Sequence, residues 1–431
     1  MKSFIYKILS LKQGEFALLS YATLFVFLLF SSYAILRPIR DSLGLEGGEE
    51  ELKWLFLATF LATLLGSILA MFVSTKVKRK FYINTIFIFF SSNLILFYLA
   101  FSFFAPHTKE FLWLSRTFYV WVSVFNLFII SSAWSLLSDI FSKERSQRLF
   151  GIISAGASLG SILGASLVSF MSFIGNNEFI FLSIFFLLLT LFCKNLMIKQ
   201  SFLLLENKEA QSEFIQNFNT PIGSKNPFLG FLLIIKSRYL LMLLVFILLL
   251  TSVSTFLYME QARIIKVHFP SREERAAAFA NIDLIVQSVS FIIQIFFTSK
   301  IVQFFGLRSL LALLGFLIGF GFIALAFSHP AFLPLVLVMS LRRIGEYALV
   351  KPGREMLFVP LDSDSKYKVK AFLDTVVYRG GDAISSQLEG VLAKISITLV
   401  LIVGAFLSFI WGILGLSLAK HYENKYPKNE K

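Results

Sequence analysis

The stretch "SKIVQFFGLR" occupies residues 299–308 and lies between two apolar runs, each long enough to cross a bilayer. A second short basic stretch, "STKVKRKF", occupies residues 74–81 and also separates two apolar runs. The two lie about 225 residues apart, and a similar distance separates "SKERSQRLFG" (142–151) from "DSKYKVKAFL" (364–373). Similarity at a fixed distance indicates that a long segment has been duplicated. The fold is therefore expected to consist of two copies of one unit.

The composition is typical of a multi-pass membrane protein. Hydrophobic residues make up 57% of the 431 residues, and Phe occurs 52 times. Charged residues make up 15%, whereas a soluble domain has about 25%. Long apolar runs recur along the whole chain, so a soluble protein with a single anchor is excluded. The first run is too long for a signal peptide and is expected to be retained as a span.

Apolar windows of about 20 residues predict twelve transmembrane helices. The windows are 17–36, 52–73, 82–104, 111–137, 148–173, 178–198, 231–258, 276–298, 307–327, 331–350, 369–392 and 395–419. The fold class that follows is an all-α membrane protein.

A polar segment divides these helices into two sets of six. It covers residues 203–227 and follows the sixth window. The predicted organisation is an N-terminal six-helix bundle (1–200), a cytoplasmic linker (201–230) and a C-terminal six-helix bundle (231–431). Two parallel six-helix repeats around a central cavity resemble the major facilitator architecture. The basic stretches after the second and eighth windows also resemble that superfamily's loop signature, Gly-x-x-x-Asp-Arg-x-Gly-Arg. The resemblance implies a major facilitator-type bundle of twelve helices.

The net charge of +14 is explained by the predicted topology. The connections alternate between basic ones, such as "KVKRK" (76–80) and "GLRS" (306–309), and acidic ones, such as "EGGEEE" (46–51). Basic connections face the cytoplasm, so both termini are expected on the cytoplasmic side. Because this rule accounts for the basic residues, no nucleic acid is expected as a partner.

The sequence contains no pattern for catalysis or metal binding. Cys193 is the one cysteine, and the four histidines lack the spacing of metal ligands. No Gly-x-x-x-x-Gly-Lys-Ser/Thr run occurs, so a P-loop for ATP hydrolysis is missing. We therefore expect neither an enzyme nor a cofactor. Gly156, Gly160 and Gly164 recur every four residues within an apolar run and are interpreted as a helix-packing face, not a phosphate-binding loop.

Three groups of ionisable residues fall inside or beside the predicted spans. A charge at mid-bilayer costs on the order of 3 kcal/mol, so such residues should pair, face water or bind a ligand. The first group ends the first span and holds Arg37, Arg40 and Asp41. Arg37 and Asp41 are four residues apart, so they can pair along one helix face, and Arg40 is free to point elsewhere. The alternative is a helix end with arginines that reach the membrane surface.

The second group lies around the seventh and eighth spans. It holds Glu260 and Arg263, together with Asp283 on the eighth span. Residues 260–275 are open to two interpretations, a continued helix or a loop. The eighth span is expected to turn its polar face toward other helices or toward a cavity.

The third group is the densest and covers the tenth and eleventh spans. Glu346 is four residues from Arg342 and three from Arg343, so either pair can form on a helix. The spacing of Asp374 and Asp382 places both on one face of the eleventh helix. These residues could form a purely structural ion-pair network, or their surplus of arginine could bind an anion, because guanidinium binds phosphate and carboxylate bidentately. The group comprises Arg342, Arg343, Glu346, Lys351, Arg354, Asp374, Arg379 and Asp382.

Part of this group also carries a family resemblance. "EYALVKPGREMLFVPLD" (346–362), followed by "SKYKVKAFLDTVVYRGGD" (365–382), resembles the ATP/ADP translocase family of plastids and intracellular bacteria. "YAILRPIRDSL" and "YMEQARIIKVHFPSREERAAAFANID" resemble two further signatures of that family. The resemblance implies that Arg40 and Arg354 contact the substrate, where the family has lysines, and that Glu260 lies near its helix-seven glutamate.

The resemblance and the buried charges lead to one functional expectation. The chain is expected to be a multi-pass transporter of a bacterial-type inner (plasma) membrane that exchanges ATP for ADP by alternating access. The expected form is a monomer in the lipid bilayer with an anionic nucleotide as its ligand. The alternative is a proton- or sodium-coupled major facilitator transporter of another organic anion. The predicted substrate-binding residues are Arg37, Arg40, Asp41, Glu260, Arg342, Arg343, Glu346, Lys351, Arg354, Asp374 and Arg379.

Overall fold

The structure is a computed structural model in which the described residues are almost entirely helical and contain no strand. Residues 359–368, which carry part of the family resemblance, and residues 1–13 and 426–431 at the ends of the chain lie outside the described residues. The described residues are 14–141, 143–171, 175–205, 208–221, 229–296, 298–358, 369–370 and 372–425.

The described helices fall into two compact units. The first unit consists of Met1–Glu46, Gly66–Ser224 and Ser271–Phe291. The second consists of Gly47–Leu65, Lys225–Pro270 and Ile292–Lys431. Two helices, α3 (Leu52–Lys76) and α11 (Arg272–Phe296), contribute residues to both units.

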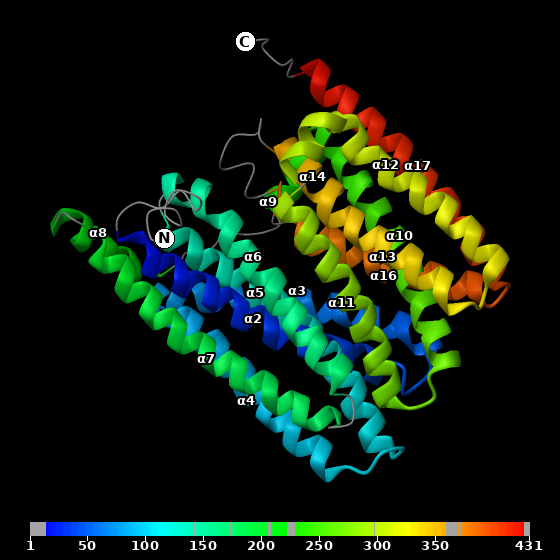
Figure 1. Ribbon diagram of the computed structural model, residues 1–431, viewed down its shortest axis with the longest axis horizontal. Helices are drawn as coiled ribbons and strands as arrows, with labels where there is room; N and C mark the ends of the chain where they lie inside the picture. Colours follow the sequence, from blue (N-terminus) through cyan, green and yellow to red (C-terminus); the bar gives the residue numbers. More distant parts are fainter. Residues whose placement is uncertain are drawn as a thin grey trace. The chain divides into compact units, whose positions relative to one another are not determined.

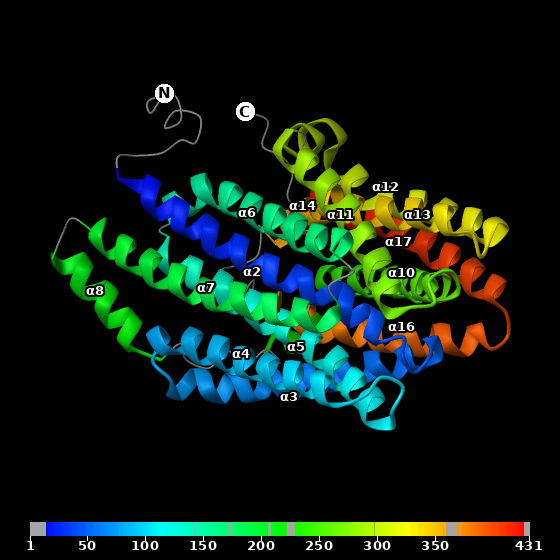
Figure 2. The ribbon, with the colours of Figure 1, turned by 60° about the horizontal axis from the view of Figure 1, so that its bottom comes forward.

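The first unit is organised around α2 (Glu15–Leu43), which lies beside α6 and α7 in both views (Figures 1 and 2). Phenylalanines fill much of its core: the rings of Phe90 and Phe125 meet edge to face, with their centroids 5.4 Å apart. Such pairs bury large areas in a defined geometry, which accounts for part of the high Phe content. The other helices of this unit are α4 (Arg79–Phe103), α5 (Lys109–Ile140), α6 (Lys143–Phe170), α7 (Asn176–Leu203) and α8 (Lys208–Asn219).

The second unit contains the helices that carry the densest charge. In it, α12 lies beside α17, and α10 contacts both α16 and α17 (Figure 1). Its helices are η1 (Glu49–Glu51), α9 (Leu229–Ile235), α10 (Arg238–His268), α12 (Thr298–Ser328), α13 (Phe332–Gly345), η3 (Glu346–Val350), α14 (Lys351–Phe358), η4 (Leu373–Val377), α16 (Tyr378–Ala393) and α17 (Ile397–Lys425).

The glycine face of α6 packs against α2, which confirms the packing interpretation. A Cβ atom on Gly160 would lie 2.1 Å from the carbonyl oxygen of Phe27, and one on Gly164 would lie 2.6 Å from that of Ser31. These distances are far below van der Waals contact, so the two backbones can approach this closely only where no side chain intervenes.

Among the described residues, ten helices are long and apolar enough to cross a membrane. The remaining two predicted spans, 331–350 and 369–392, are also helical, but each contains a five-residue π-helical segment, η3 or η4. These segments shorten the flanking α-helices and coincide with the densest charge. The all-α fold is thus confirmed for the described residues, with two spans of irregular helical geometry.

Two connections between predicted spans differ from what the hydropathy of the sequence predicts. The helix α10 continues to His268, so Glu260 and Arg263 lie on a helix and the connection to α11 is only 269–271. In "SKIVQFFGLR", Gly306 has φ 64° and ψ 172° and separates two helical pieces that together form α12. That backbone conformation is open almost only to glycine, so this residue makes the turn in the basic stretch.

Candidate functional site

The central ion pair of the second unit joins α13 to η3. Arg342 Nη1 donates to Glu346 Oε2 at 2.9 Å and to Ser254 Oγ on α10 at 2.5 Å. Of the two pairs that the sequence left open, the structure shows Arg342–Glu346, and a hydroxyl group ties this pair to a second helix. Both side chains are largely buried, as is Arg343, which is 3% exposed.

The π-helical segment η3 begins at Glu346, within this ion pair. A π-helix has a wider turn than an α-helix, and such segments are frequent at functional sites. Four cationic side chains act electrostatically on the Glu346 carboxylate: Arg342, Lys351, Arg354 and Arg343. One acid is thus surrounded by cations that come from both ends of the π-helical segment.

The neighbouring helix adds a second set of contacts. Asp382 Oδ1 accepts a hydrogen bond from Thr255 Oγ1 at 3.0 Å, and its Oδ2 lies 3.7 Å from Arg379 Nη1. Arg354 Nη1 lies 3.4 Å from Asp374 Oδ1, which belongs to η4. Arg342 and Glu346 also act electrostatically on Asp382, so both sets of contacts form one neighbourhood.

We call this neighbourhood the Arg342 cluster. It holds five cationic and three acidic side chains, so among these described groups positive charge is in excess. Each of its acids contacts an arginine, which reduces the cost of burial. The arrangement can accept an anion through arginines that exchange carboxylate partners for ligand oxygens. Its members are Arg342, Arg343, Glu346, Lys351, Arg354, Asp374, Arg379 and Asp382.

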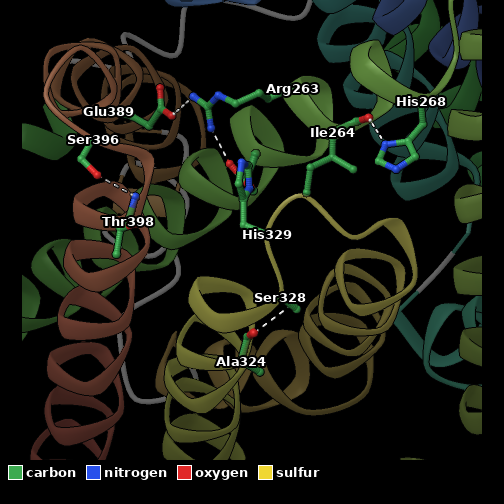
Figure 3. Close-up of polar contacts among 10 residues, drawn as sticks. Arg263, Ile264, His268, Ala324, Ser328, His329, Glu389, Ser396 and Thr398 are labelled. Carbon is green, nitrogen blue, oxygen red and sulfur yellow. Dashed lines mark hydrogen bonds and ion pairs between the residues drawn. The ribbon is translucent and has the colours of Figure 1, made fainter.

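Glu260, which was predicted for the same site, belongs to a different group in the same unit. Arg263 Nη2 lies 2.6 Å from Glu389 Oε1, and Arg263 Nη1 also pairs with Glu260 Oε2. His329 Nδ1, in the connection between α12 and α13, lies 2.5 Å from Glu260 Oε1. Figure 3 shows Arg263 on α10 reaching toward Glu389, with His329 nearby. We call Glu260, Arg263, His329 and Glu389 the Glu260 network.

Sequence reasoning did not include His329 and Glu389 in any site. Glu389 lies seven residues after Asp382, and a spacing of two turns places both on one helix face. That spacing could have identified Glu389 as a polar residue of the same face. His329 lies between two helices, where no periodicity applies, so its position depends on the tertiary structure alone.

The first unit holds the remaining predicted residues. Asp41 Oδ1 accepts hydrogen bonds from Nε of its neighbour Arg40 at 2.8 Å and from Nη2 of the same side chain at 2.5 Å. Arg40 also donates to Ser123 Oγ at 3.3 Å and lies over the ring of Tyr119. Arg37 Nη1 lies 3.6 Å from Asp283 Oδ1 on α11.

These contacts decide one pairing that the sequence left open. Arg40, which the helix spacing left free to point elsewhere, pairs with Asp41, because its long side chain folds back onto this neighbour at the end of α2. Backbone spacing places adjacent residues about 100° apart on a helix, but it does not limit the reach of a guanidinium group. Arg37, Arg40 and Asp41 all belong to the first unit.

The many long apolar helices indicate a multi-pass membrane protein. A comparison with sequence families identifies the class of membrane protein. Residues 18–350 match the Major Facilitator Superfamily, and the chain belongs to that superfamily. Its members are typically carriers and not enzymes. No curated protein matches the chain.

Solved transporters share the fold at low sequence identity. A POT family transporter in complex with 5-aminolevulinic acid is 14% identical, with a TM-score of 0.62, and the match covers 95% of this chain and 97% of that one. The inward-open xylose transporter XylE from E. coli is 13% identical, with a TM-score of 0.61, and the match covers 96% of this chain and 98% of that one. These similarities concern the fold alone.

Proposed function

We propose that the chain exchanges nucleotides, ATP for ADP, across a membrane by alternating access. The observation that supports this most directly is the Arg342 cluster, in which five cationic side chains accompany three acids. A cluster with this charge excess suits a ligand with several negative charges, and a polyphosphate is such a ligand. The resemblance of residues 346–382 to the ATP/ADP translocase family supports the same substrate class.

The acids of the cluster have a defined part in this proposal. With no ligand bound, Glu346 pairs with Arg342 and Asp374 with Arg354, so the arginines are not left as uncompensated buried charges. An arriving phosphate group replaces these carboxylates, and the carboxylates re-form their pairs when it leaves. The ligand is thereby held without being trapped, as exchange requires.

A second candidate is a proton- or sodium-coupled major facilitator transporter of another organic anion. The buried carboxylate of Asp382, which is 7% exposed, favours it because a buried acid can carry a proton. The two candidates differ in one measurement. Exchange is stimulated by nucleotide on the opposite side of the membrane, whereas coupled transport responds to an ion gradient.

The test is counterflow of labelled ADP into proteoliposomes loaded with unlabelled ATP. We expect Arg342→Gln and Arg354→Gln each to reduce the initial rate on the order of tenfold to a hundredfold, the effect of losing one charge-assisted hydrogen bond. Arg40→Gln should act in the same direction if the first unit also contacts the ligand.

The matched control is Arg116→Gln. Arg116 belongs to the first unit and lies over the ring of the exposed residue Trp113. The control should keep its rate within about twofold, as surface substitutions do. Wild-type liposomes that show no ATP-stimulated uptake would contradict nucleotide exchange. Full activity of both Arg342→Gln and Arg354→Gln would contradict the role of the cluster.

A further inference from the structure

Ser254 on α10 holds the side chain of Arg342 through a hydrogen bond whose direction is fixed. The Ser254 hydroxyl donates to the carbonyl oxygen of Leu250, one turn earlier in the same helix, at 2.8 Å. A hydroxyl group has one hydrogen atom, so this oxygen is left with acceptor capacity only. Nη1 of Arg342 donates to it at 2.5 Å. Ser254 therefore suits a guanidinium group, which donates hydrogen bonds and accepts none.

Both hydrogen bonds of Arg342 to described residues are made by the same nitrogen atom. Besides Ser254, Nη1 contacts Glu346 Oε2 at 2.9 Å. The Nε atom is buried and has no hydrogen-bond partner within the described part of the chain, although Arg342 is only 9% exposed. A buried N–H group without a partner is destabilising, so this edge of the guanidinium group is the part that a ligand would satisfy.

The Nε–Nη2 edge of a guanidinium group matches a narrow class of ligand groups. The guanidinium is planar, and its Nε–H and one Nη2–H bond point in parallel. Two parallel donors bind two oxygen atoms of one carboxylate or phosphate group at the same time. A single carbonyl oxygen would leave one of the two donors unsatisfied. The edge therefore selects a carboxylate or phosphate group over a neutral acceptor.

Asp382, an acid that could occupy this edge, is held by other residues. It lies close enough to Arg342 to interact with it electrostatically. Its Oδ1 accepts a hydrogen bond from Thr255 at 3.0 Å, and its Oδ2 lies 3.7 Å from Arg379. None of the ion pairs among the described residues joins Asp382 to Arg342. Because Thr255 directly follows Ser254, two consecutive residues of α10 keep the arginine and the acid apart.

We propose that Ser254 is a positioning residue that fixes Arg342 so that its Nε–Nη2 edge faces a phosphate group of the arriving ligand. This inference rests on the proposed nucleotide exchange and names the first contact of the substrate at the Arg342 cluster. The edge is available while Nη1 still holds Glu346, so the phosphate group is bound before that carboxylate is displaced. The arginine thus passes from one anion to the next without becoming an uncompensated buried charge.

The test is the binding of inorganic pyrophosphate to the purified full-length chain, measured from the rise of the melting temperature with ligand concentration. Ser254→Ala removes the acceptor, so the guanidinium group is no longer held in one orientation. The apparent Kd should rise about fivefold to tenfold, the effect of losing one hydrogen bond. Ser254→Thr keeps the hydroxyl group and should restore a Kd within about twofold of the wild-type value.

The matched control is Ser252→Ala on the same helix. The Ser252 hydroxyl donates to the carbonyl oxygen of Leu248 at 2.8 Å and accepts a hydrogen bond from Ser385 on α16 at 2.8 Å. The substitution removes an equivalent contact between helices but no contact to a charged group, so the Kd should stay within about twofold of wild type. An equal rise for Ser252→Ala and Ser254→Ala would overturn the proposal, because the effect would then come from helix packing.

Arg342→Lys provides a second measurement, which separates positioning from packing. Lysine keeps the positive charge but has no planar edge to be oriented. If Ser254 acts through that edge, adding Ser254→Ala to Arg342→Lys should change the Kd less than about twofold. Independent effects that multiply in the double variant would overturn the proposal, as would a wild-type Kd in Ser254→Ala alone.

Ser254→Cys takes the place of the alanine variant if that variant does not fold. Its thiol is close in size to the hydroxyl group, but sulfur is a weak acceptor, so the Kd should again rise, by about threefold or more. A wild-type chain that binds no pyrophosphate would also overturn the inference. Pyrophosphate contains no nucleoside, and ADP counterflow is measured separately. Weaker pyrophosphate binding by Ser254→Ala in a chain without counterflow would support the role of Ser254 and contradict nucleotide exchange alone.

Discussion

At the scale of single residues, the identity of ion-pair partners decides the chemistry of this protein. Sequence spacing left Glu346 with two candidate arginines, and the structure shows a 2.9 Å contact with Arg342 that Ser254 on another helix supports. The central position of Glu346 among four cations follows from the π-helical turn that begins at this residue. In the proposed exchange mechanism, its carboxylate competes with the ligand anion for the same guanidinium groups.

This competition predicts the effect of Glu346→Gln. Removing the carboxylate should strengthen ligand binding and slow ligand release, so KM for labelled ADP should fall about fivefold and the maximal exchange rate should fall by a similar factor. The concentration dependence of counterflow measures both quantities. Glu423→Gln serves as the control, since Glu423 pairs with the exposed Arg308. A raised KM in Glu346→Gln would show that the carboxylate contacts the ligand favourably.

At the scale of helices, small residues determine how closely two elements approach. The glycines of α6 allow its backbone to contact that of α2, and the sequence predicted this because a four-residue repeat defines one helix face. The π-helical segments η3 and η4 were not predicted. Each segment widens the turn of a helix whose hydropathy pattern is otherwise regular. The packing around charged residues determines where these segments occur.

The space around two glycines predicts different effects of Gly→Ala substitution: Gly160 lies at the α2–α6 contact, whereas Gly380 lies on α16. Gly160→Ala places a methyl group against the Phe27 carbonyl and should destabilise the protein by about 1–3 kcal/mol. Gly380→Ala meets its nearest atom, in Phe60, at 3.5 Å, which is an ordinary contact. It should leave stability unchanged or raise it by about 1 kcal/mol through helix propensity. Thermal unfolding of both variants provides the measurement, and equal effects would contradict the close packing.

At the scale of the whole molecule, charge distribution predicts orientation in the membrane. The exposed residues Lys80 and Arg308 belong to two basic connections, whereas Glu50 belongs to an acidic connection. Basic connections are retained in the cytoplasm, so the acidic connection should face outward. Both termini are expected on the cytoplasmic side.

Cysteine labelling tests this orientation. In a Cys193→Ser background, Glu50→Cys should react with a membrane-impermeant maleimide on intact cells at least about tenfold more than Lys80→Cys or Arg308→Cys. Permeabilised cells provide the control, because all three positions should then react. Labelling of Lys80→Cys on intact cells would reverse the predicted topology.

The sequence by itself determined the all-α membrane fold, and it placed the ionisable residues of the Arg342 cluster on two consecutive predicted spans. Hydrophobic length and helical spacing are local properties, so they can be read along the chain. Only the tertiary structure decided that Arg40 pairs with Asp41, that two helices contain π-helical segments, and that His329 and Glu389 join Glu260. These features depend on which helices face one another and how far long side chains reach, and neither is encoded in the spacing of residues within one helix.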